Sequence, residues 1–265
     1  MRMALCFYGL VGSVADKNGQ GISLDPSIAH RYYKENILDL NNEVDIFIHS
    51  WSINSKEELV ELYNPKKFII ESQVSFPDSK KHPSIKGSFF EQLKMGYLKL
   101  FKRNNYFNKK EIKEKEAFRA YSRWYSVKQS IQLMRNYELD NGFHYDCVMS
   151  TRLDIAFFKP VVFKKFDMNF FYASNWNDSS NRNEKNEANK LNRHKGKGFL
   201  DFWFFSNTKT MYLFSKLFDD IEHYSISPHS SSYQHLKTIT CNVKYVYYRW
   251  FDHEMIRRKF FNSKK

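Results

Sequence analysis

The chain has few cysteine, proline and glycine residues. Its 265 residues include three cysteines, Cys6, Cys147 and Cys241, which lie far apart in apolar segments and match neither a disulfide framework nor a metal site. We expect buried free thiols, which favour a reducing compartment such as the cytoplasm. Only nine glycines and six prolines accompany 42% hydrophobic residues, which excludes a disordered chain and indicates a globular domain.

Long apolar runs are also missing. No stretch approaches the length of about 20 residues that a transmembrane helix needs. The opening ALCFYGLVGSVA resembles a short signal peptide, but only one positive charge precedes it, and Tyr8 and Gly9 interrupt the apolar run. We therefore interpret residues 3–8 as a first strand that is followed by a glycine loop.

Acidic residues are outnumbered, with 29 Asp and Glu against 42 Lys and Arg, and the net charge is +13. Such a charge favours anionic partners: nucleotide diphosphates, nucleic acid or an acidic membrane surface. No RNA-recognition, zinc-finger or helix-turn-helix pattern is present, so we expect no specific nucleic-acid partner. The C-terminal RRKFFNSKK is either a solvated tail or a peripheral contact with the anionic inner membrane.

Apolar periodicity predicts alternating strands and helices. We expect strands at residues 3–8, 44–49, 67–71, 170–174, 199–205 and 243–250, and helices at 26–40, 56–63, 114–141, 207–223 and 232–239. Ser55 and Glu58 have the spacing of a capping box at the second helix. The order predicts one α/β domain with a mostly parallel central sheet flanked by helices. Residues 73–110 predict an insertion over the site, and the polar residues 175–197 predict a mobile loop.

The most informative segment is YDCVMSTRLDIAFF, from Tyr145 to Phe158. It predicts a buried strand that ends on Asp154, with Arg152 two positions earlier. A buried carboxylate needs a cation or hydrogen-bond donors, and ligands of α/β sheets bind beyond the carboxyl ends of the strands. The two residues are therefore either an ion pair that closes the strand or a site for a phosphate and a divalent metal.

Five segments of the chain resemble, in the same order, the GT-A-type glycosyltransferases that build bacterial and viral surface polysaccharides. They are ALCFYGLVGS, VDIFIHSW, the helix from Tyr125 to Glu138, YDCVMSTRLDIAF and FLDFWFFSNTKTM. The resemblance implies a GT-A-like single domain over residues 1–265. It also implies a hexosyltransferase-like enzyme that moves a sugar from a nucleotide-sugar donor to a glycan acceptor of capsule or lipooligosaccharide.

The resemblance also implies a nucleotide-binding set. Its members are Tyr8, Gly9, Leu10, Gly12, Ser13, His49, Trp51, Arg152 and Asp154. Glycines let backbone amides approach a nucleotide, although Gly-x-x-Gly also describes a plain turn. His49 and Trp51 end a strand, where they contact the ligand or belong to the core.

The metal-binding motif departs from the family. Most GT-A enzymes carry Asp-x-Asp, whereas this chain has Arg152-Leu153-Asp154. A Mn²⁺ or Mg²⁺ ion on Asp154 would act as a Lewis acid on the departing diphosphate, and Mg²⁺ needs only one or two protein carboxylates. Metal dependence stays open, because Arg152 is also able to neutralise a phosphate directly.

Asp201 lies in the apolar segment FLDFWFF, where its pKa should be raised unless it is paired. It is a candidate catalytic base for the acceptor hydroxyl, a contact for the acceptor sugar, or one half of an ion pair. Trp176 and the loop after it are a candidate lid, and Asp252 and His253 are further candidate ligands.

Other functions are weighed against this one. The chain has no P-loop, no Gly-x-Ser-x-Gly elbow and no His-Glu-x-x-His motif. The alternatives are a phosphoryl-type transferase that acts on the same glycan, and a non-catalytic glycan- or nucleic-acid-binding protein.

Overall fold

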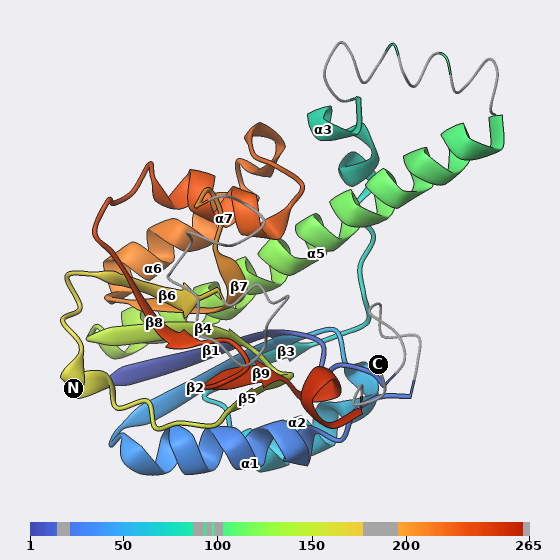
Figure 1. Cartoon of the computed structure of the whole chain (residues 1–265). Coiled ribbons are helices and arrows are strands. Elements are labelled where there is room, and N and C mark those ends of the chain that lie inside the picture. Colours follow the sequence, from blue (N-terminus) through green and yellow to red (C-terminus); the bar gives the residue numbers. More distant parts are fainter. Residues whose placement is uncertain (15–21, 87–92, 94–96, 98–102, 177–195, 262–265) are drawn as a thin grey trace.

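The computed structural model of the protein describes residues 1–14, 22–86, 93, 97, 103–176 and 196–261. Its centre is a seven-stranded sheet in the order β3-β2-β1-β4-β7-β6-β8 (Figure 1). The strands are β1 (Met3–Gly9), β2 (Val44–Ser50), β3 (Lys67–Ile70), β4 (Cys147–Arg152), β6 (Phe171–Asn175), β7 (Leu200–Ser206) and β8 (Val243–Tyr248). All pairs are parallel except those of β7 with β4 and β6. The prediction of an α/β fold with a mostly parallel sheet is confirmed.

Helices cover both faces of this sheet (Figure 1). On one face lie α1 (Pro26–Asn36) and α2 (Lys56–Tyr63), and on the other lie α5 (Arg103–Asn141), α6 (Thr208–Ser215) and α7 (Pro228–Leu236). Leu5 and Phe7 of β1 pack toward α1, whereas Ala4 and Cys6 pack toward α5. A central parallel strand is buried on both faces, which explains why its sequence is a continuous apolar run.

The strand that was predicted to end on Asp154 ends two residues earlier, at Arg152. The chain turns after Arg152, and β5 (Ile155–Phe157) pairs with β9 (His253–Met255) in a separate two-stranded sheet. The apolar residues of β5 look like a continuation of β4 in the sequence. The sequence did not predict β9, because its buried Glu254 breaks the apolar pattern; Arg249 compensates that charge at 2.8 Å.

Several helix boundaries also differ from the prediction. The long helix α5 begins at Arg103 instead of 114, and α7 begins at Pro228 instead of 232. The helix predicted at 207–223 is α6 followed by 3₁₀ turns at Lys216–Phe218 and Ile221–His223. The capping box was wrong, because Ser55 makes no side-chain capping hydrogen bond.

The remaining elements are short. They are 3₁₀ turns at Leu38–Leu40, Ile53–Ser55, Pro77–Lys81 and Phe163–Lys165, the helix α3 (Pro83–Lys86) and a π-helical turn at Arg257–Phe261. Most of the loop predicted at 175–197, and parts of the insertion predicted at 73–110, lie outside the described residues. Within the described ranges, no helix is both long and apolar enough to cross a membrane. Cys6 and Cys147 are buried as expected, whereas Cys241 is exposed and that expectation was wrong.

A tyrosine of α1 fixes the end of β4. Tyr33 is fully buried, its hydroxyl donates to the Arg152 carbonyl at 2.7 Å, and it lies 2.7 Å from Thr151 Oγ1. The last two residues of β4 are thereby tied to the helix beneath the sheet. The backbone that carries the Arg152 side chain is therefore fixed in position.

Replacing Tyr33 with Phe should lower the free energy of unfolding by about 1–3 kcal/mol, because two buried polar groups lose their partner. Urea denaturation measures the change. The matched control is Tyr32→Phe on the same helix, whose hydroxyl bonds to no described residue and whose loss should change stability by less than about 0.5 kcal/mol. Equal losses in the two variants would contradict this role for Tyr33.

Candidate functional site

A cavity of about 1030 Å³ opens at the carboxyl ends of β1, β2 and β4. The chain runs outward from β1 to β2 and β3, then returns on the other side of β1 as β4. This reversal of strand order is the place where ligands bind in open α/β sheets. The cavity is large enough for a nucleotide that carries a further group.

The loop after β1 forms one wall of this cavity. The Gly9 amide donates to Ser126 Oγ at 2.9 Å, and the Val11 amide donates to Ser52 Oγ at 3.0 Å. Both glycines of the loop have positive φ, +90° at Gly9 and +94° at Gly12. A Cβ atom at Gly12 would lie only 3.2 Å from Asp154 Cβ. The loop after β1 therefore touches the turn after β4, and a side chain at Gly12 would push them apart.

Arg152 and Asp154 form a bidentate ion pair in the cavity wall. Arg152 Nε and Nη2 each donate to a different carboxylate oxygen of Asp154, both at 2.6 Å. The Asp154 side chain is 2% exposed, and that of Arg152 is 18% exposed. Burial opposes the charge of Arg152, but the neighbouring Asp154 carboxylate raises the pKa of the guanidinium. The ion-pair interpretation is thus what the structure shows, and it stands beside the ligand interpretation because both residues line the cavity.

Trp51 lines the cavity and His49 does not. His49 is buried, with Nδ1 2.7 Å from Ser126 Oγ and Nε2 3.2 Å from Glu71 Oε1. Burial lowers the pKa of His49 although Glu71 opposes the shift, so the ring ties β2 to its neighbours as a neutral group. Trp51 stacks on Tyr125 with ring centroids 5.7 Å apart, and its buried indole N–H has no hydrogen-bond partner among the described residues.

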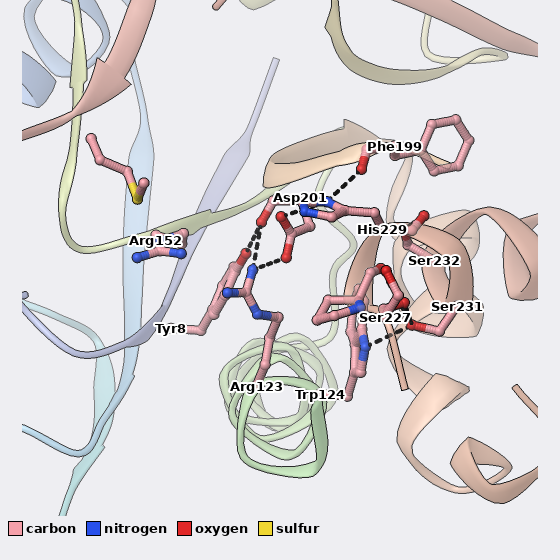
Figure 2. Close-up of polar contacts among 12 residues, drawn as sticks. Tyr8, Arg123, Trp124, Arg152, Phe199, Asp201, Ser227, His229, Ser231 and Ser232 are labelled. Atoms are coloured by element: carbon pink, nitrogen blue, oxygen red, sulfur yellow. Dashed lines mark hydrogen bonds and ion pairs between the residues drawn. The ribbon is translucent and has the colours of Figure 1, made fainter. Parts of the chain in front are cut away.

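Asp201 sits behind the cavity wall, among three partners (Figure 2). Arg123 of α5 donates to its carboxylate and, at 3.0 Å, to its backbone carbonyl. His229 Nδ1 of α7 lies 2.9 Å from Asp201 Oδ1, and the Tyr8 hydroxyl donates to the Asp201 carbonyl at 3.0 Å. Tyr8 and Arg123 both line the cavity, so Asp201 holds one cavity-lining cation in place.

The protonation state of Asp201 follows from these partners. Burial alone would raise the pKa of its carboxyl, but the charges of Arg123 and His229 hold that pKa well below its usual range. The carboxylate is therefore a weak base, both of its oxygens are engaged, and it is absent from the described cavity lining. The catalytic-base role stays a prediction without support from this geometry.

Positive charge dominates the cavity. Six basic side chains line it, namely Lys80, Lys115, Arg119, Arg123, Arg152 and Arg257, against three acidic ones, Glu111, Glu114 and Asp154. Glu111 already pairs with Lys115 at 2.6 Å. This excess favours an anionic ligand.

The donor set does not fit a divalent metal as it is arranged. Both carboxylate oxygens of Asp154 are occupied by Arg152, and no three metal-ligating side chains come together within the described ranges. Mg²⁺ and Mn²⁺ prefer several oxygen ligands around one position. The side chains of this wall thus present arginine donors and a carboxylate that is already paired.

The structure thus brings most of the predicted site together. Eight of the nine predicted nucleotide-binding residues line one cavity, and His49 is the exception. Trp176 is buried with its ring 4.5 Å from that of His229, Asp252 pairs with Lys159 at 3.0 Å, and the buried His253 contacts Ser174. These three do not line the cavity in the described structure.

Sequence reasoning missed several residues of the site. Arg123 and His229 were not identified as site residues. For Arg123 the sequence offered a signal, because it is a charged residue next to Trp124 of the apolar stripe of α5. The segments around Gln73 and Phe76, which also line the cavity, had no regular pattern to reveal them. No protein-family model and no curated protein sequence matches the chain.

The two glycines of the loop offer a matched test. Gly9→Ala and Gly12→Ala share a φ near +90°, but a Cβ meets nothing within 4 Å at Gly9, whereas at Gly12 it lies 2.9 Å from Leu24 Cδ1. We expect both variants to be destabilised by backbone strain of about 1–2 kcal/mol, with a larger loss in Gly12→Ala. Urea denaturation measures the difference; equal losses would show that the contact between the loop and Asp154 is loose.

Asp201→Asn should lower the free energy of unfolding by about 3–5 kcal/mol near pH 5, since it leaves Arg123 without its anion. The folded-state pKa of Asp201 lies below the unfolded value of about 3.9, so its stabilisation is present above that value. It is lost as the pH falls below about 4 toward the folded pKa. Urea denaturation at pH 5 and pH 3 should show the two proteins converging. A difference that grows toward pH 3 would contradict the ion pair.

Proposed function

We propose that the chain is a glycosyltransferase that uses a nucleoside-diphosphate sugar and whose cavity binds the diphosphate through arginines. The observation that carries the proposal is the cavity itself. It lies at the reversal of strand order, next to a glycine loop with positive φ, and holds the Arg152–Asp154 pair. These features support a GT-A-like nucleotide-binding core, to which the sequence motifs also point.

Arg152 retains donors for a phosphate. A guanidinium has five N–H groups, and Asp154 accepts from only two of them. Three N–H groups remain for phosphate oxygens, while Asp154 fixes the plane of the guanidinium. Asp154 is thus a positioning residue for Arg152, in the way that Asp201 is one for Arg123.

Trp51 contributes apolar surface to the cavity wall. The stack of Trp51 on Tyr125 also gives the cavity an aromatic wall, against which a base or a sugar ring can pack.

The reaction class follows from the charge distribution. Transfer of a glycosyl group breaks the bond between the sugar and the diphosphate, so negative charge develops on the departing diphosphate. Preorganised cations at that place stabilise the transition state more than the ground state. Arg152 and Arg123, each already held by a carboxylate, need no reorganisation to do so. The acceptor is a glycan in this proposal, and a surface polysaccharide is the acceptor that the sequence motifs favour.

Thermal unfolding with UDP, GDP, CDP, ADP and CMP tests the proposal, each with EDTA and with Mg²⁺ or Mn²⁺. We expect one diphosphate at about 100 times its Kd to raise the Tm by roughly 5–10 °C, also in EDTA. The shift should vanish in Arg152→Gln. It should persist in Arg31→Gln, which removes an arginine of α1 that does not line the cavity.

Three other results of this experiment would contradict all or part of the proposal. No shift with any nucleotide would overturn the proposed function in favour of a non-catalytic binding protein. A shift with CMP alone would favour the phosphoryl-type transferase, which releases a monophosphate. A shift that requires a metal would keep the transferase and overturn its arginine-centred form.

A further inference from the structure

The cavity continues from the arginine pairs along one face of α5. Among the described residues of this helix, seven line it, from Glu111 to Arg123. The five between these ends are Glu114, Lys115, Phe118, Arg119 and Ser122. Their separations alternate between three residues and one, which places all seven side chains on a single face of the helix. A helix rises by about 1.5 Å per residue, so this face is about 18 Å long.

The segment that follows β3 forms the facing wall (Figure 1). Gln73, Phe76 and Lys80 belong to this wall and line the cavity. Ser122 Oγ donates to Gln73 Oε1 at 2.8 Å, and the ring centroids of Phe76 and Phe118 lie 5.8 Å apart. The two walls are thus fixed against each other before any ligand binds. We call the part of the cavity between residues 111–122 and residues 73–80 the α5 groove.

The α5 groove presents hydrogen-bond donors, hydrogen-bond acceptors and aromatic rings together. Glu111 and Lys115 pair at 2.6 Å, yet a carboxylate has further acceptor sites and an ammonium has further N–H donors. A sugar hydroxyl both donates and accepts, so it matches such a mixed set. The ring of Phe118 is partly exposed, and an aromatic face suits the C–H groups of a pyranose ring. The chemistry of the groove is that of a carbohydrate site.

The charges of the α5 groove disfavour a nucleic-acid strand. Glu111 and Glu114 lie on the same face of the helix as Lys115, and two carboxylates repel a row of phosphates. Tight binding of a polynucleotide requires several cations that each neutralise a phosphate. The cations without such neighbours, Arg123 and Arg152, lie at the other end of the cavity.

The length of the groove and its exposure indicate the size of the ligand. A face of about 18 Å is much longer than a single sugar ring. Lys80, Lys115 and Arg119 line the cavity and are exposed. A chain that fills the groove is therefore able to continue into solvent.

We propose that the α5 groove binds a linear oligosaccharide of several sugars, whose terminal sugar lies at the arginine pairs. That this glycan is the acceptor rests on the proposed function. In the transfer, the terminal hydroxyl oxygen bonds to the anomeric carbon of the donor sugar. The bond from that carbon to the diphosphate breaks, the nucleoside diphosphate leaves with the bonding electrons, and the hydroxyl proton passes to solvent. The enzyme would thus elongate an existing glycan.

A glycan array tests this proposal with the full chain. The probes are fragments of bacterial capsule and lipooligosaccharide of one to six sugars. The protein is applied alone and with each of UDP, GDP, CDP, ADP and CMP. In at least one series, we expect fragments of three or more sugars to bind at least about tenfold more tightly than the mono- and disaccharides, because each further sugar adds contacts along α5.

Three matched pairs of variants locate the binding. The groove variants are Phe118→Leu, Glu114→Gln and Lys80→Gln, and their controls in the same order are Phe218→Leu, Glu116→Gln and Lys81→Gln. Phe218 packs on Phe76 as Phe118 does, and none of the three control residues lines the described cavity. Each groove variant should weaken binding of the hexasaccharide about three- to tenfold, and each control should change it less than about twofold. The nucleotide-dependent shift of the Tm should persist in all six variants.

Several results would overturn the proposal. They are binding of no fragment under any condition, equal affinity for short and long fragments, and equal losses in groove and control variants. Salt-sensitive binding of an oligothymidylate that the groove variants abolish would assign the groove to nucleic acid. Glycan binding without a nucleotide-dependent Tm shift would keep the groove and overturn the proposed function. A Tm shift without glycan binding would do the reverse.

Discussion

The site depends on the pairing of carboxylates that the fold buries at the edge of its cavity. Asp154 and Asp201 are almost inaccessible to solvent, and a buried carboxylate is costly unless a cation satisfies it. Asp154 therefore pairs with Arg152, and Asp201 pairs with Arg123. The fold has to keep these pairs for its own stability, and in doing so it fixes two guanidinium groups in a cavity wall. The donors of both groups are therefore oriented before any ligand arrives, and an anion bound at this wall would not have to order them.

The parts of this architecture that the sequence could predict are those that arise from local patterns. Continuous apolar runs identified the parallel strands, and their order gave the α/β class. The carboxyl ends of neighbouring parallel strands meet at one edge of the sheet, so residues after β1, β2 and β4 had to converge. Gly12, Trp51 and Asp154, which are far apart in the chain and which the resemblance to GT-A enzymes had grouped, accordingly line one cavity. Strand pairing joins residues that are far apart in the chain, but the alternation of strands and helices and the length of each element limit the pairings that are possible.

The parts that could not be predicted are pairwise contacts between distant elements. Asp201 looked like a base because a lone carboxylate in an apolar strand should have a raised pKa. Its partners come from α5 and α7, and they reverse the direction of the shift. His49 looked like a ligand because it ends a strand, yet Ser126 and Glu71 satisfy both of its ring nitrogens. Periodicity carries no information on such pairs. A polar residue in an apolar run shows that a partner is needed, but it shows neither which residue the partner is nor what the pair does.

One helix, α5, holds together parts of the site that come from distant segments of the chain. Ser126 accepts a hydrogen bond from the Gly9 amide and lies 2.7 Å from His49 Nδ1, and Arg123 pairs with Asp201. The glycine loop, β2 and β7 are thus fixed against the same helix. Residues three apart on a helix lie on one face, so the spacing of Arg123 and Ser126 allows a single helix to make all of these contacts.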